Sequence, residues 1–88
     1  MKQVPTRGVT TAKIMASRAF QRGLADAREG VGFDSCAFAD DIDNAWDYER
    51  GRLFAHIAPL DMPLRIGREL NPRAIALCEL AFDRGLIV

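Results

Sequence analysis

The chain has 88 residues, of which 49% are hydrophobic, and its 12 basic and 12 acidic side chains give a formal net charge of zero. The length suits one small domain, and the apolar content indicates a folded core. A zero net charge is atypical of a protein whose main partner is nucleic acid. No stretch reaches the roughly 20 apolar residues of a membrane span, and no apolar segment follows the basic start, so we expect a cytoplasmic protein that does not bind membranes.

The first part of the chain is predicted to be an arm followed by a helix. Residues 1–9 contain proline and glycine, which discourage regular structure, and are expected to form a flexible arm before a single helical domain over 10–88. Apolar residues then recur at three- and four-residue steps over 11–29, which predicts an amphipathic helix. Its opposite face is basic and includes Arg18 and Arg22.

A second helix is predicted over 39–57, because Pro59 prevents its continuation. Its start is acidic, and carboxylates there interact favourably with the helix dipole. The acidic residues are Asp40, Asp41, Asp43 and Asp47. Apolar residues lie on two faces: Ile42, Ala45, Trp46, Leu53 and Ile57 on one, and Tyr48, Gly51 and Ala55 on the other. A helix with two apolar faces is expected to lie at the centre, with the other helices on its flanks.

The last third of the chain is predicted to be a loop and a third helix. Apolar residues alternate within 58–70, but no credible partner strand exists in the chain, so this segment is expected to be a loop. Asn71 followed by Pro72 is a strong helix start, and it predicts a helix over 72–85. The expected fold is therefore all-α, a compact three-helix domain whose central helix spans 39–57, with no sheet.

The tetrapeptide pattern aromatic, any residue, Arg, Gly occurs three times, in Phe20–Gly23, Tyr48–Gly51 and Phe82–Gly85. A glycine three positions after an aromatic residue lies on the same helical face and lets a neighbouring backbone approach closely. We therefore expect packing roles for both members of each pattern and for the one tryptophan. These residues are Phe20, Gly23, Trp46, Tyr48, Gly51, Phe82 and Gly85.

Arg22, Arg50 and Arg84 precede the three glycines, and two interpretations of them stay open. The one we favour is that they cover aromatic rings and pair with carboxylates such as Asp26 and Asp47. The other is that they form a basic rim for a partner.

Catalytic, metal and cofactor sites are not expected. Consecutive acidic residues of a helix point around its axis, whereas a metal needs converging ligands. Cys36 and His56 could act as nucleophile and base, but nothing in the sequence suggests a third group to orient them. Cys78 lies in an apolar helical run and is expected to pack as a small hydrophobe. No nucleotide- or cofactor-binding motif occurs, so we expect a protein that is not an enzyme.

Residues 18–55 resemble the ribosome modulation factor group of very small bacterial and mobile-element proteins. The matching features are Arg18-Ala19-x-Gln21-Arg22-Gly23, Gly30, an aromatic residue after the loop, and Tyr48-x-x-Gly51-x-x-x-Ala55. The resemblance implies two antiparallel helices that meet at their glycines, and it implies binding to the ribosome or to RNA.

Two functions remain in view. The first is a small binding protein that docks on a larger bacterial protein complex and modulates or inhibits it, as phage accessory proteins do. Its expected contact residues are Asp40, Asp41, Asp43, Asp47, Arg18, Arg22, Arg50 and Arg52. The alternative is ribosome or RNA binding through Lys13, Arg18 and Arg22. Phosphate contacts weaken steeply with salt, and this separates the two.

Overall fold

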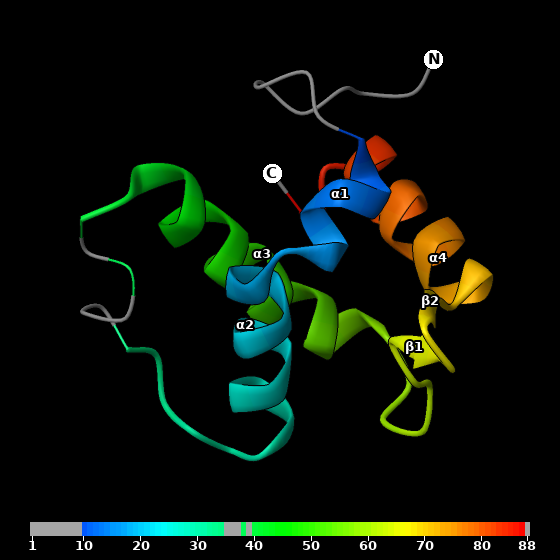
Figure 1. Ribbon diagram of the computed structural model, residues 1–88, viewed down its shortest axis with the longest axis horizontal. Coiled ribbons are helices and arrows are strands. Elements are labelled where there is room, and N and C mark those ends of the chain that lie inside the picture. The colour runs from blue at the N-terminus through cyan, green and yellow to red at the C-terminus, as the bar shows by residue number, and fades with distance from the viewer. Residues whose placement is uncertain (1–9, 35–37, 39, 88) are drawn as a thin grey trace.

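The computed structural model describes residues 10–34, 38 and 40–87, and the expected arm over 1–9 lies outside them. Figure 1 shows the arrangement of the helices and of one short hairpin. The elements are α1 (Thr11–Ala16), α2 (Arg18–Arg28), α3 (Ile42–Ile57), β1 (Arg65–Ile66), β2 (Glu69–Leu70) and α4 (Pro72–Asp83). The prediction of a mainly helical domain is confirmed, whereas the predicted number and limits of the helices need correction.

The helix predicted over 11–29 is two helices, because Ser17 interrupts it. The backbone of Ser17 is extended, with φ −67° and ψ 148°. Its hydroxyl accepts a hydrogen bond from the Phe20 amide at 3.1 Å and donates one to the Ile14 carbonyl at 2.7 Å. A serine side chain that bonds to nearby backbone groups competes with helical bonding and caps the next helix. Ser17 therefore ends α1 and starts α2.

Helix α3 starts at Ile42, later than the predicted start at residue 39, which lies outside the described residues. Asp41 is the cap: its Oδ1 accepts hydrogen bonds from the amides of Asp43 at 3.0 Å and Asn44 at 3.2 Å. Because a capping residue has a non-helical backbone, Asp40 and Asp41 precede the helix instead of forming its first turn.

The prediction that the chain contains no sheet was wrong. Strands β1 and β2 pair antiparallel, with Arg65 opposite Leu70 and Ile66 opposite Glu69. Gly67 has φ +65°, which allows the tight two-residue turn that joins them. The partner of strand β1 is therefore β2, the next segment along the chain.

Helix α4 starts as predicted and ends two residues early. The Asn71 side chain accepts a hydrogen bond from the Arg73 amide at 3.0 Å, and Pro72 follows at the first helical position. At the other end Gly85 has φ +72°, and the Leu86 amide donates to the Ala81 carbonyl at 2.9 Å. This is the usual bonding of a helix that stops at glycine. Gly85 is therefore a helix stop, and its predicted role in a close helix contact was wrong.

The close approach predicted at the other two glycines is confirmed. A side chain at Gly23 would collide with the Tyr48 carbonyl, and one at Gly51 would collide with the Phe20 carbonyl. The pairing runs in opposite directions along the two helices, since residue 20 meets 51 while 23 meets 48. Helices α2 and α3 are therefore antiparallel and in backbone contact.

The core lies where α1, α2, the C-terminal half of α3 and α4 meet. Its buried residues are Ile14, Met15, Phe20, Leu24, Phe54, Ala58, Ala74, Cys78, Ala81, Phe82 and Ile87. Helix α4 packs against α1, and the two lie side by side in Figure 1. Because α4 joins α1, it does not cover the outer side of α3. The prediction of a central helix flanked on both sides is therefore corrected.

A candidate docking groove on helix α3

The apolar face of α3 that the sequence placed in the core is largely exposed. Ile42 is 74% exposed, Trp46 46% and Leu53 41%. The opposite face is buried through Tyr48 and Phe54. Trp46, for which a packing role was predicted, therefore contributes to the surface. Single exposed apolar residues are ordinary, whereas several on one helix face are typical of binding surfaces.

A groove of about 440 Å³ runs along this exposed face. Its lining consists of Phe33 from the loop after α2 together with Trp46, Glu49, Arg50, Arg52, Leu53 and His56 of α3. Phe33 is 54% exposed, so both walls present apolar side chains to solvent. We call this site the α3 groove.

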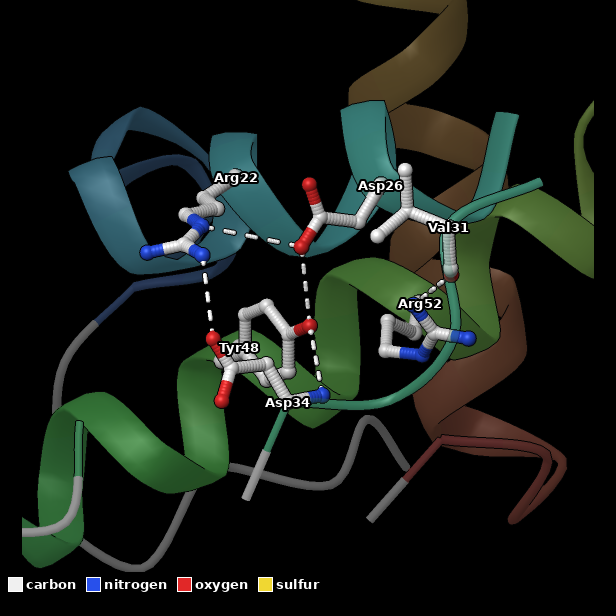
Figure 2. Close-up of polar contacts among 6 residues, drawn as sticks. All are labelled: Arg22, Asp26, Val31, Asp34, Tyr48 and Arg52. Atoms are coloured by element: carbon white, nitrogen blue, oxygen red, sulfur yellow. Dashed lines mark hydrogen bonds and ion pairs between the residues drawn. The ribbon is translucent and has the colours of Figure 1, made fainter. Parts of the chain in front are cut away.

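A polar network holds the loop that forms one wall of the α3 groove (Figure 2). The Tyr48 hydroxyl donates to Asp26 Oδ2 at 2.9 Å and accepts a hydrogen bond from the Asp34 amide at 3.2 Å. Arg22 bridges the two carboxylates, with its Nε 3.6 Å from Asp26 and its Nη2 3.2 Å from Asp34. The loop is thus fixed to α2 and α3 together.

Two further contacts position the wall itself. The Arg52 guanidinium donates to the Val31 carbonyl at 2.9 Å, as Figure 2 shows. The ring of Phe33 lies 5.6 Å from that of Tyr48, at a tilt of 51°. Such tilted aromatic pairs are attractive beyond their buried area. Phe33 is therefore held beside α3 by contacts on both sides of it in the chain.

Arg50 lines the α3 groove, and its partner is the buried Asp47. Asp47 and Arg50 make an ion pair of 2.9 Å, and they are only 3% and 6% exposed. The Arg50 guanidinium also lies 5.7 Å from the centre of the Trp46 ring. The sequence placed both residues among the partner contacts, but their burial removes them from the exposed surface. The favoured interpretation of Arg50, a carboxylate pair beside a ring, describes what the structure shows.

The other predicted contact residues lie on two different parts of the surface. Asp40 and Asp41 are exposed at the start of α3, where Asp43 is half-buried. Arg18 and Arg22 are exposed on α2, while Arg52 is half-buried in the α3 groove. Sequence reasoning missed Phe33, Glu49, Leu53 and His56 as surface residues of one site. The recurrence of 42, 46, 49, 53 and 56 at four- and three-residue steps was the signal for a single face.

The lining residues of the α3 groove include no serine, threonine or cysteine that could act as a nucleophile. Cys78, which is buried in the core, is no better placed: burial and the neighbouring Glu79 raise the pKa of its thiol to about 12. Within the part of the chain that the structure describes, no three His, Cys, Asp or Glu side chains gather as metal ligands do. The chemistry that the groove itself offers is apolar contact bordered by charge.

None of the described helices has both the length and the apolar content needed to cross a membrane. Comparison with protein-family models, with curated proteins and with solved structures finds nothing that matches this chain.

Proposed function

We propose that the protein is a small non-catalytic binding protein that docks on a larger bacterial protein or protein complex and modulates or inhibits it. The observation that carries the proposal is the α3 groove, in which Phe33, Trp46 and Leu53 offer apolar surface to solvent. Aromatic side chains in a concave, rigidly held site are the usual anchors of protein–protein contacts. The polar network of Tyr48 supplies the rigidity, because it fixes the wall before any partner arrives.

The charges around the α3 groove suggest the chemistry of the partner. Asp40 and Asp41 are exposed immediately before α3, and Glu49 is exposed inside the groove. The positive charge of Arg50 is compensated by Asp47. A partner segment that carries an apolar anchor next to basic side chains therefore fits the acidic part of this site. Complementary charges of this kind speed association more than they add affinity.

The RNA-binding alternative depends on the basic face of α1 and α2. Lys13 and Arg18 are exposed there, but Arg22 is occupied by Asp26 and Asp34. Two lysine or arginine side chains displace few counterions from phosphate, so such binding would be weak at physiological salt. This observation favours the protein partner.

A photo-crosslinking amino acid at position 53, introduced in bacterial cells, tests the proposal. The matched control is position 80, since Leu80 is 44% exposed on α4 and Leu53 is 41% exposed on α3. We expect one protein other than the chain itself to be captured from position 53 and not from position 80. Nuclease treatment should leave this capture unchanged. Equal capture at both sites, or none at position 53, would contradict the proposal.

The captured protein is then purified and titrated against the chain. Trp46 is the only tryptophan and lines the α3 groove, so its emission reports occupancy directly. We expect Leu53→Glu to weaken binding at least about tenfold and Leu80→Glu to leave it unchanged. Asp40→Lys should slow association with little effect on dissociation. An interaction that does not respond to Leu53→Glu would exclude the groove as the docking site.

A further inference from the structure

The exposed stripe of α3 has the spacing of a helix–helix seam. Trp46, Glu49 and Leu53 follow one another at steps of three and four, and Ile42 and His56 extend the series at either end. All five side chains are on the exposed side of the helix. Residues spaced in this way form the seam along which one helix packs against another. The occupant that matches the face best in shape is therefore a second helix.

The charges inside the α3 groove are complementary but do not meet each other. Glu49 is exposed and makes no hydrogen bond or ion pair with any residue that the structure describes. Arg52 uses one N–H for the Val31 carbonyl, and a guanidinium has five. The groove thus holds the Glu49 carboxylate, which has no partner among the described residues, and the Arg52 guanidinium, which has further N–H groups that can donate. An occupant that brings one charge of each sign satisfies both.

We propose that a second copy of this chain covers the α3 groove, with the two α3 helices antiparallel about a two-fold axis. Trp46 and Leu53 are seven positions apart, so an axis midway between them passes beside Glu49 and Arg50. Trp46 of each copy then lies against Leu53 of the other. A two-fold contact uses the same patch on both copies, and it therefore requires a self-complementary surface such as this one.

The antiparallel direction follows from the positions of the two charges. With this axis, Glu49 of one copy and Arg52 of the other differ by two helical positions, about 3 Å along the helix, which both side chains can span. The same axis leaves the two Glu49 side chains about 1.5 Å apart along the helix, with an Arg52 of the other copy beside each of them. Parallel helices would place Glu49 directly against Glu49 and Arg52 directly against Arg52, and would leave the opposite charges farther apart, about 4.5 Å along the helix. The dimer therefore contains two equivalent Glu49–Arg52 ion pairs.

This inference rests on the proposed function in one respect, since both use the same groove. Self-association and docking then exclude each other, and the dimer is the state of the protein in the absence of its partner. The partner must separate the two copies, so its apparent affinity falls as the concentration of the chain rises.

Sedimentation equilibrium of the full chain between about 1 and 200 µM tests the dimer without any partner. We expect the mass to rise from 9.8 kDa toward twice that value, and the Trp46 emission to shift to the blue over the same range. Leu53→Glu should weaken self-association at least about tenfold, whereas the control Leu80→Glu should not. A chain of 9.8 kDa throughout, or equal effects of both substitutions, overturns the inference.

A charge exchange tests the pairing of Glu49 with Arg52 across the axis. Glu49→Arg and Arg52→Glu should each be monomeric alone, because each puts like charges together. An equimolar mixture of the two variants should dimerise, since the two copies then carry opposite charges at positions 49 and 52. A mixture that stays monomeric, while dichroism shows both variants folded, overturns the proposed Glu49–Arg52 pairing. If the parent chain is monomeric, the dimer is overturned and the crosslinking result alone decides the docking proposal. If the chain dimerises but no partner is captured, only the docking proposal is overturned.

Discussion

The backbone carbonyl of Phe20 rests against Gly51, with the Phe20 carbonyl carbon 2.9 Å from where a side chain would begin. Tyr48 and Gly23 repeat this relationship in the opposite sense, with the Tyr48 carbonyl carbon at 2.9 Å. The first two aromatic–x–Arg–Gly patterns thus each supply a carbonyl to the other's glycine. The neighbouring atoms are backbone, which cannot rotate away as a side chain can, so the contact tolerates no added atom.

Gly51→Ala is expected to destabilise the protein by about 1–3 kcal/mol, because it overpacks this contact. On an exposed helix the same change would stabilise by up to about 1 kcal/mol. Urea denaturation measures the difference. Gly32→Ala is the control, since nothing lies within 4 Å of a side chain at that position. A Gly51→Ala protein as stable as the control would contradict the close contact.

Tyr48→Phe is expected to cost about 1–2 kcal/mol, because it removes the hydroxyl shared by Asp26 and the Asp34 amide. The ring and its contact with Phe33 are retained, so the effect isolates the polar network. Hydrogen exchange at the Asp34 amide should accelerate more than exchange in α4. Unchanged exchange there would show that the loop is held by other contacts.

Ser17→Ala is expected to lower stability by about 1 kcal/mol, since the cap of α2 is lost. Ser17→Asp keeps an acceptor for the Phe20 amide and should retain most of the stability. Thermal unfolding of the two variants shows whether the Ser17 side chain stabilises the start of α2 or only marks an interruption between α1 and α2. If Ser17→Ala is instead more stable, then α1 and α2 have joined into the continuous helix that the apolar pattern predicted.

Cys78 is expected to resist alkylation at pH 7 until the protein unfolds, because burial raises the pKa of its thiol to about 12. The group ionises in the unfolded chain near pH 9 but not in the folded one, so its contribution to stability is complete below pH 9 and declines above it. Between pH 9 and 12 the free energy of unfolding of the parent should therefore fall by up to about 1.4 kcal/mol per pH unit more than that of Cys78→Ala. Denaturation curves at pH 8, 9.5 and 11 measure this, and parallel losses would contradict it.

The sequence predicted best those features that depend on local pattern. Paired glycines at helical spacing were enough to locate the α2–α3 contact, and Asn71 with Pro72 was enough to start α4. The break at Ser17 could not be predicted from the apolar stripe, which continues across it, whereas a single side chain caps α2. The hairpin was missed because Gly67 allows a partner strand only two residues away.

The α3 groove could not be predicted in the same way. Periodicity showed that α3 has two apolar faces, but it cannot say which of them a distant helix covers. That outcome depends on α4 packing against α1, a contact between opposite ends of the chain. Trp46 was assigned to the interior for this reason, although its exposed neighbour Glu49 already marked a face that water reaches.

The pairing of α1 with α4 also bears on the order in which the molecule folds. Gly23 and Tyr48 are 25 positions apart in the chain, whereas α1 and α4 are separated by more than twice that span. Closing the longer loop costs about 0.6–0.8 kcal/mol more, and it can succeed only after the intervening segments have collapsed. We therefore expect the α2–α3 hairpin to form first and the two ends of the chain to close over it later. The α3 groove belongs to the early unit, so transient opening of the chain ends leaves it in place.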